Sequence, residues 1–272
     1  RKGMIVGVYG PLASVKPSLF KEANFIIQGE PEEVIIKISK TNKIPKGVIK
    51  SNSIMDLDSL PFPDWDIFTT EHCSLSPVIS AKPAFLVHAS RGCPYKCSYC
   101  PYHVFGTYRV RKPEKVIDEL IFLKKKYGMK AFFFRDPTFS INSNRIEQIA
   151  QLIINKKLNL QWGCETRLDL LTIPLLKLMH KSGLRAIKVG VESIDHNLLK
   201  KYSRLLPNVE HQERIIKFCE KSGIKIVAFY IIGIPSDTKK SIRDTINYSK
   251  KLNTSFANFT ICTPIPGTPF YE

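Results

Sequence analysis

The sequence predicts an α/β fold built on a parallel sheet. Six short apolar segments, each of a length typical of a buried strand, lie between residues 84 and 262. They alternate with segments in which apolar residues recur every three or four positions, as on one face of a helix. Repeated alternation of strand and helix is typical of a parallel sheet with helices outside it. In parallel barrels the chemically active groups lie at the C-terminal ends of the strands, so functional residues are expected there.

Each of these elements can be placed along the chain. The strands are expected at residues 84–90, 131–136, 160–165, 186–192, 225–233 and 256–262. The helices are expected at roughly 113–127, 143–156, 174–182, 195–202, 209–222 and 238–252. Pro113 followed by Glu114 is typical of a first helical turn, and Ser236 or Asp237 is expected to cap the last helix.

The first 50 residues are organised differently. Two strand-like segments, MIVGVYG and NFIIQGE, precede a helix-like stretch, EPEEVIIKIS. This is about two strand–helix units, too few for a complete doubly wound domain. The following segment, SIMDLDSLPFPDWDIF, is rich in proline and aspartate, which disfavour regular structure. We therefore predict a partial domain at 1–50, a linker at 51–82 and a core domain at 83–272.

The bulk composition limits the classes of partner. The net charge is +17, from 41 basic and 24 acidic residues, but the lysines are spread along the chain without an arginine-rich stripe interleaved with aromatics. A lysine-rich surface is therefore favoured over a nucleic-acid partner. The longest apolar stretch, IVAFYIIGIP, is about half the length that a bilayer-spanning helix needs. The first residues do not resemble a signal peptide, and the cytoplasm is the expected location.

Three cysteines in the run RGCPYKCSYCP have the spacing CxxxCxxC. Thiolates select iron–sulfur clusters, zinc or copper(I), and three of them leave one position of a four-ligand site open. Structural zinc is an alternative, for which His103 is the close fourth ligand. A disulfide framework is less favoured, because seven cysteines are an odd number.

RGCPYKCSYCP resembles the cluster loop of the radical S-adenosylmethionine (radical SAM) superfamily, in which an aromatic residue, here Tyr99, directly precedes the third cysteine. The resemblance implies a partial (β/α)6 TIM-like barrel as the radical SAM core. It also implies a 4Fe–4S cluster on Cys93, Cys97 and Cys100, with SAM bound to the open iron. One electron from the cluster would cleave SAM to methionine and a 5′-deoxyadenosyl radical, which removes a hydrogen atom from substrate.

The resemblance also assigns SAM contacts to later strand ends. Asp136, in FFFRDPTFSIN, would receive the SAM amino group, and Arg167 would pair with the SAM carboxylate as a two-pronged donor. The alternatives are a turn at Asp136-Pro137 and an ion pair between Arg167 and Glu165.

Two further contacts belong to the fourth and fifth strands. Glu192, in VGVES, would bind the ribose hydroxyls, and the alternative is a helix cap formed with Ser193. Gly233 and Pro235, in FYIIGIPSDT, would let the backbone approach the adenine, and the alternative is a tight turn that needs no cofactor.

The N-terminal segments VYGPLAS and IIQGEPEEV, with LPFPDWD in the linker, resemble the C-terminal part of the Rossmann-like cobalamin-binding domain that precedes many radical SAM enzymes. Cobalamin is therefore a candidate cofactor, although the family's DxHxxG segment is not in this chain. Relatives continue past PIPGTPFYE, so the chain is expected to be a fragment at both ends.

The resemblance ranks methyl transfer to an unactivated carbon first, with SAM as the source of both methyl group and radical. Other members of this branch perform oxidative ring formation or oxidation. The expected partners are a small-molecule substrate and an electron donor such as flavodoxin or ferredoxin. The alternatives are a transfer-RNA methylthiotransferase, whose family carries three further cysteines in an N-terminal domain, and a non-enzymatic structural zinc protein.

Overall fold

The computed structural model describes residues 3–102, 106–205 and 208–272 of the chain. The chain forms two compact units, each made of segments that are separated in the sequence. The smaller comprises Arg1–Leu57, Arg91–Arg109 and Thr263–Glu272, and the larger comprises Asp58–Ser90 and Val110–Cys262. These units do not test the boundaries expected at residues 50 and 83, which stay a prediction.

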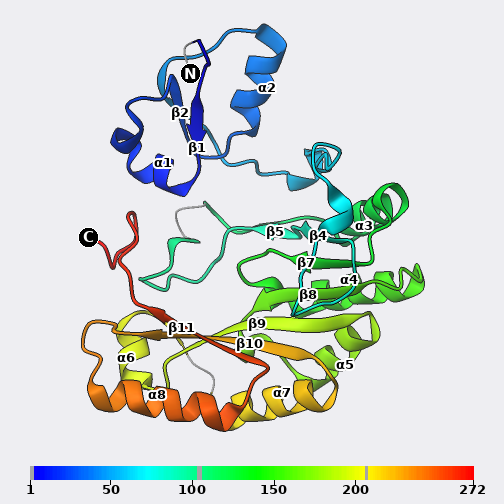
Figure 1. Cartoon of the computed structure of the whole chain (residues 1–272), viewed down its shortest axis with the longest axis vertical. Helices are drawn as coiled ribbons and strands as arrows, with labels where there is room; N and C mark the ends of the chain where they lie inside the picture. The colour runs from blue at the N-terminus through cyan, green and yellow to red at the C-terminus, as the bar shows by residue number, and fades with distance from the viewer. Residues whose placement is uncertain (1–2, 103–105, 206–207) are drawn as a thin grey trace. The chain divides into compact units, whose positions relative to one another are not determined.

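The larger unit is built on a six-stranded sheet in which every neighbouring pair is parallel (Figure 1). The strand order follows the chain: β4 (Ala84–Val87), β7 (Ala131–Phe134), β8 (Gln161–Thr166), β9 (Leu184–Glu192), β10 (Lys225–Ile232) and β11 (Phe256–Ile261). The structure therefore confirms the α/β fold class with a parallel sheet.

Helices follow these strands and cover one face of the sheet (Figure 1). They are α3 (Pro113–Tyr127), α4 (Ser143–Asn155), α5 (Ile173–Lys181), α6 (His196–Lys201), α7 (Val209–Lys221) and α8 (Lys239–Leu252). Pro113 begins α3 as expected. The cap expected for α8 is wrong, because the N-cap is Thr238, whose hydroxyl accepts a hydrogen bond from the Ser241 N–H in a capping box.

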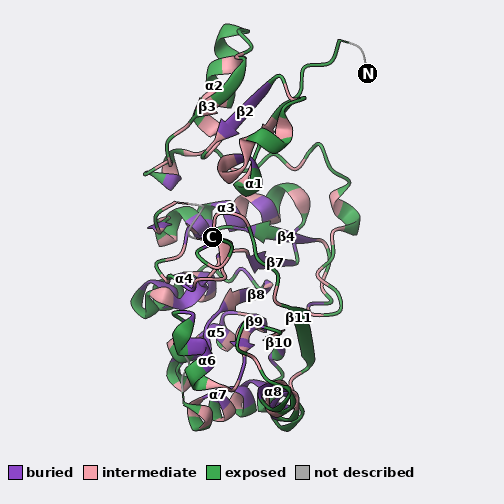
Figure 2. Ribbon diagram, turned by 90° about the vertical axis from the view of Figure 1, so that its left-hand side faces the viewer, coloured by how far each residue is buried: buried purple, intermediate pink, exposed green. Residues whose placement is uncertain are grey.

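The two faces of this sheet have different surroundings. On the helix-covered face, Phe132, Phe134 and Trp162 belong to the large core cluster and contact one another through their rings. On the other face, Ala131 and Phe133 form a smaller buried cluster with residues that include Ile79 and Ala84. Buried residues follow the central strands, whereas β11 is exposed along its whole length (Figure 2).

The smaller unit contains a three-stranded parallel sheet in the order β1 (Gly7–Tyr9), β2 (Phe25–Gln28) and β3 (Gly47–Lys50). Its helices are α1 (Pro11–Val15) and α2 (Glu32–Thr41). The first two strands and α2 agree with the sequence pattern. The pattern missed β3, because Gly47–Lys50 is short and lies among lysines that resemble an exposed loop.

Short elements complete the chain. A two-stranded ribbon pairs β5 (Ser90–Arg91) with β6 (Arg109–Val110). Single 3-10 turns are η1 (Pro17–Phe20), η2 (Leu57–Ser59), η3 (Thr70–His72), η5 (Phe139–Ile141) and η6 (Leu168–Leu170). In the described part of the chain no helix is both long and apolar enough to cross a bilayer.

Candidate functional site

The three-cysteine loop belongs to the smaller unit and begins directly after β5. Cys97 is buried, and Cys93 and Cys100 are half-buried. The Cys100 N–H donates a hydrogen bond to the Cys97 carbonyl oxygen at 3.0 Å, which closes a tight turn between these two residues. Tyr99, within this turn, is half-buried. His103, the expected fourth ligand of a zinc site, lies outside the described residues.

The donor set of this loop suits an iron–sulfur cluster by its chemistry. All seven cysteines are described, and none forms a disulfide. Three thiols close together in the sequence are the ligand type that such clusters require. Among residues 3–102, 106–205 and 208–272, no three His, Cys, Asp or Glu side chains are gathered as a metal site. The assignment of the three cysteines as ligands therefore rests on their chemistry and spacing.

In the larger unit, the face of the sheet opposite the helices carries charged residues toward the C-terminal ends of the strands. Arg135 follows β7 and pairs with Glu165 on β8, and Lys188 Nζ on β9 lies 3.7 Å from Glu165 Oε1. Lys188 Nζ also lies 4.8 Å from the centroid of the Phe133 ring, which places it on that face. The sequence interpretation missed Arg135 and Lys188. Their positions two residues after Phe133 and Ala186 were the available signal, because alternate residues of a strand share a face.

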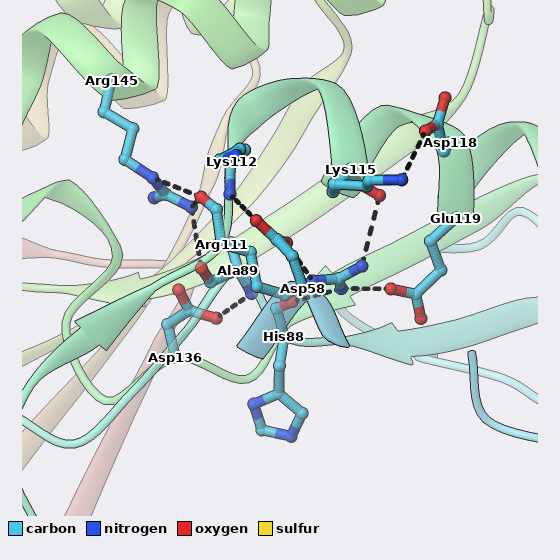
Figure 3. Close-up of polar contacts among 10 residues, drawn as sticks. All are labelled: Asp58, His88, Ala89, Arg111, Lys112, Lys115, Asp118, Glu119, Asp136 and Arg145. Atoms are coloured by element: carbon cyan, nitrogen blue, oxygen red, sulfur yellow. Dashed lines mark hydrogen bonds and ion pairs between the residues drawn. The ribbon is translucent and has the colours of Figure 1, made fainter. Parts of the chain in front are cut away.

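Asp136 has no exposed surface, and the structure shows partners for both of its carboxylate oxygens. Oδ1 accepts a hydrogen bond from the Ala89 N–H at 2.8 Å (Figure 3). Oδ2 accepts one from the Ser90 hydroxyl at 2.6 Å. Burial raises the pKa of Asp136 to about 6, although these hydrogen bonds and the charge of Arg145 oppose the shift. The prediction that Asp136 receives the SAM amino group stays a prediction, and it would require one of these bonds to be exchanged.

Arg145, on α4, also binds the backbone at Ala89, on the side opposite Asp136 (Figure 3). Its Nη2 donates to the Ala89 carbonyl oxygen at 2.7 Å and to the Arg111 carbonyl oxygen at 2.8 Å. Arg111 in turn donates to the His88 carbonyl oxygen at 2.9 Å and forms an ion pair with Glu119 on α3. Residues 88–90, between β4 and the cysteine loop, are therefore held by three charged side chains: Asp136 after β7, Arg145 on α4 and Arg111, which precedes α3.

Arg167 lies directly after β8 and is 4% exposed. Its Nε and Nη2 donate to the two carboxylate oxygens of Asp169 at 2.9 and 2.7 Å, and Nη2 also donates to the Leu205 carbonyl oxygen at 3.0 Å. A guanidinium held in this way has its orientation fixed before any ligand binds. Whether it contacts SAM stays a prediction.

Glu192 ends β9 in a left-handed conformation, with φ of 67°. Its Oε1 lies 3.9 Å from Arg204 Nη2, and a Cβ added to Gly190 would lie 2.1 Å from the same oxygen. The Glu192 carboxylate therefore occupies space that is open only because residue 190 is a glycine without a side chain. The alternative in which Glu192 and Ser193 cap the next helix is wrong, because Asp195 is the N-cap of α6.

Gly233 and Pro235 form the turn between β10 and α8. Gly233 has φ of 77°, in the region that glycine adopts most readily, and its N–H donates to Asp237 Oδ2 at 2.9 Å. The Pro235 carbonyl oxygen accepts a hydrogen bond from the Tyr202 hydroxyl at 2.8 Å. The turn is therefore braced by side chains of this unit, and its contact with adenine stays a prediction.

The cysteine loop and the strand ends both lie within the stretch of the chain that a family model recognises. The model of the radical SAM superfamily matches residues 87–249. The chain belongs to the radical SAM superfamily. Enzymes of this superfamily use a 4Fe–4S cluster together with SAM.

Two curated relatives align with almost the whole radical SAM chain. An uncharacterised methyltransferase of Pyrococcus horikoshii is 29% identical over 100% of the chain, which covers 63% of that protein. The anaerobic magnesium-protoporphyrin IX monomethyl ester cyclase of Rubrivivax gelatinosus is 27% identical over 98% of the chain, which covers 52% of that protein. The chain thus spans between half and two-thirds of the length of these relatives.

A solved structure supports the fold. The cobalamin-dependent S-adenosylmethionine radical enzyme OxsB, with aqua-cobalamin and S-adenosylmethionine bound, superposes with a TM-score of 0.70 at 18% identity. The match covers 94% of this chain and 40% of that one. It confirms the radical SAM fold predicted from the sequence.

Proposed function

We propose that the chain carries the radical-generating core of a cobalamin-dependent radical SAM enzyme that transfers a methyl group to an unactivated carbon of a small molecule. The observation that carries the proposal is the CxxxCxxC loop, which follows the first strand of a parallel sheet inside the stretch matched by the family model. The methyltransferase relative that spans the whole chain supports methyl transfer. OxsB, described as cobalamin-dependent, supports cobalamin as a second cofactor.

In this proposal Cys93, Cys97 and Cys100 hold a 4Fe–4S cluster. When bound and reduced, the cluster supplies the electron that cleaves SAM to methionine and a 5′-deoxyadenosyl radical. The protein binds and orients SAM and keeps water away from the radical. An electron donor such as flavodoxin or ferredoxin reduces the cluster, which fits an enzyme of the cytoplasm.

The proposed SAM contacts lie at strand ends. Arg167 is the proposed two-pronged donor to the SAM carboxylate. Because its Nε and Nη2 already donate to Asp169, this contact would require that ion pair to be exchanged. Glu192 accepts from the ribose hydroxyls, because an ionised carboxylate can accept from two hydroxyl donors. Asp136 is the proposed acceptor for the amino group.

The turn of Gly233 and Pro235 is the proposed contact for the adenine, and Tyr99 in the cluster loop is a further proposed cofactor-binding residue. Gly233 has no side chain, so the backbone of this turn could approach the flat ring closely. Residues 1–50 are proposed as the last part of a cobalamin-binding domain, followed by a linker at 51–82 and the radical SAM core at 83–272.

The first test is SAM cleavage by the full-length enzyme. The protein is reconstituted anaerobically with iron and sulfide and reduced with dithionite in the presence of SAM. Formation of 5′-deoxyadenosine and methionine is expected, and a Cys97→Ala variant should form neither. A reconstituted protein that holds a cluster but leaves SAM intact would contradict the proposal.

The second test addresses methyl transfer and uses hydroxocobalamin as the probe. Excess dithionite reduces the hydroxocobalamin to cob(I)alamin, to which SAM labelled in its methyl group should transfer that group, giving labelled methylcobalamin and S-adenosylhomocysteine. An oxidative cyclase is the second candidate, because the cyclase of Rubrivivax gelatinosus aligns with 98% of the chain. Cleavage to 5′-deoxyadenosine without any labelled methylcobalamin would favour the cyclase.

A further inference from the structure

Glu30 joins three segments of the smaller unit that are far apart in the sequence. It follows β2, and its carboxylate accepts two hydrogen bonds from Arg109, at 2.9 Å to Oε2 and 2.8 Å to Oε1. Oε2 also accepts from the Ile54 N–H. On its other side, Oε1 lies 3.4 Å from Nη1 of Arg91, whose Nη2 pairs with Glu32 at 2.7 Å.

The two arginines flank the cysteine loop. Arg91 lies two residues before Cys93, and Arg109 lies nine residues after Cys100. One carboxylate therefore binds both ends of the segment that carries the three thiols. The two ends of this segment also pack closely against each other, because a Cβ added to Gly92 would lie 2.5 Å from the Thr107 carbonyl oxygen.

The ion pair between Glu30 and Arg109 is protected from solvent. The Arg109 side chain is 4% exposed and that of Glu30 is 14% exposed. Arg109 also donates to the carbonyl oxygens of Thr107 at 3.0 Å and of Ile54 at 2.6 Å. A charged pair that is shielded and whose donors are engaged is worth more than an exposed surface pair.

Glu30 is ionised at neutral pH. Burial alone would raise the pKa of its carboxyl group, but the hydrogen bonds from Arg109 and Ile54 and the charge of Arg91 outweigh burial and lower the pKa. Removal of this charge leaves a buried guanidinium without its counter-ion, which is costly.

We propose that Glu30 is a positioning residue for the three-cysteine loop, which it fastens to the end of β2 by binding Arg91 and Arg109. The proposal rests on the proposed function, in which Cys93, Cys97 and Cys100 hold the cluster. Its consequence is that the N-terminal sheet, and not the loop alone, determines how firmly the cluster is held.

The test compares Glu30→Gln with Glu33→Gln in the full-length enzyme. Glu33 lies on α2, three residues from Glu30, and is exposed, so it is a matched control for the loss of one carboxylate charge. After anaerobic reconstitution, iron release to a chelator is followed by absorbance, and the reduced cluster is examined by electron paramagnetic resonance with and without SAM. Hydrogen bonds to charged groups contribute about 1.5–3 kcal/mol, so release from Glu30→Gln should be roughly tenfold faster or more.

The spectroscopic measurement separates positioning from general destabilisation. A displaced loop should alter the spectral change that SAM induces in Glu30→Gln, and circular dichroism should still show the folded chain. Glu33→Gln should match the wild type in both measurements. Equal release rates and equal SAM-induced spectra for Glu30→Gln and Glu33→Gln would overturn the proposal.

Two additional variants keep the test decisive. If Glu30→Gln does not fold, Arg91→Gln replaces it, because the Arg91 side chain is 32% exposed and its loss leaves the Glu30–Arg109 pair in place. Faster release from Arg91→Gln supports the proposal, and release at the wild-type rate overturns it. A Cys97→Ala variant that retained all iron would instead refute the ligand assignment on which the proposal rests.

Discussion

Asp136 and Arg145 bind opposite sides of the same residue. The Asp136 carboxylate accepts the hydrogen bond from the Ala89 N–H, and the Arg145 guanidinium donates to the Ala89 carbonyl oxygen. Ala89 is wholly buried and lies four residues before Cys93. Two buried charged groups thus fix the backbone at the point where the chain leaves β4 for the cysteine loop.

Asp136→Ala should destabilise the protein. The substitution leaves the Ala89 N–H and the Ser90 hydroxyl buried without the acceptor that each has now. Each orphaned donor costs about 1–3 kcal/mol. Asp136→Asn should cost much less, because its amide can accept from Ala89 and donate to the Ser90 oxygen. Urea denaturation measures both, with the exposed Asp118→Ala as control. Equal stabilities of the Asp136→Ala and Asp118→Ala variants would show that the hydrogen bonds from Asp136 to Ala89 and Ser90 do not stabilise the fold.

The pH dependence of stability should carry a contribution from Asp136. Its pKa is about 6 in the folded protein and near 3.8 when unperturbed, so the folded state binds the extra proton between these values. The stabilising contribution is complete below about pH 4 and is lost as the pH rises through 6. A difference of about two pKa units corresponds to roughly 3 kcal/mol.

Asp136→Asn should remove this contribution, and Asp118→Asn should retain it. The free energy of unfolding, measured for both variants and the wild type from pH 4 to 7, checks the prediction. Parallel curves for the wild type and Asp136→Asn would show that Asp136 does not titrate in this range.

Local sequence patterns predicted the sheet of the larger unit, because a buried strand and an amphipathic helix each leave a short-range signature. Phe134 and Trp162 lie in strands that the sequence placed at 131–136 and 160–165, and both are buried in the large core cluster. The partners of charged side chains leave no such signature. Glu30 and Arg109 are 79 residues apart, and nothing in either segment identifies the other. The cysteine motif was readable, since its chemistry depends on spacing within eight residues.

Gly190→Ala should weaken SAM binding without changing any residue that is proposed to touch SAM. The new Cβ would lie 2.1 Å from Glu192 Oε1, so the carboxylate must leave its present position. If Glu192 binds the ribose, the SAM dissociation constant should rise about tenfold, as expected for loss of a hydrogen bond to a charged group. Calorimetry on the reconstituted enzyme measures this, and Glu192→Gln should show an effect of the same sign. A normal affinity in both variants would exclude Glu192 from the ribose site.

Arg167→Lys should weaken SAM binding more than Arg185→Lys does. Lysine keeps the positive charge but cannot present two parallel N–H groups to a carboxylate. Arg167 lies at the C-terminal end of β8, where SAM contacts are proposed, whereas Arg185 is near the start of β9 and donates to the carbonyl oxygens of His180 and Leu184. Loss of a charged hydrogen bond should raise the SAM dissociation constant about tenfold or more for Arg167→Lys. Arg185→Lys should bind SAM as the wild type does.

Because Arg167 is also held by Asp169, the thermal midpoints of both variants must be compared. Similar SAM affinities for the two variants would show that the Arg167 guanidinium stabilises the fold through Asp169 and Leu205 and does not bind SAM.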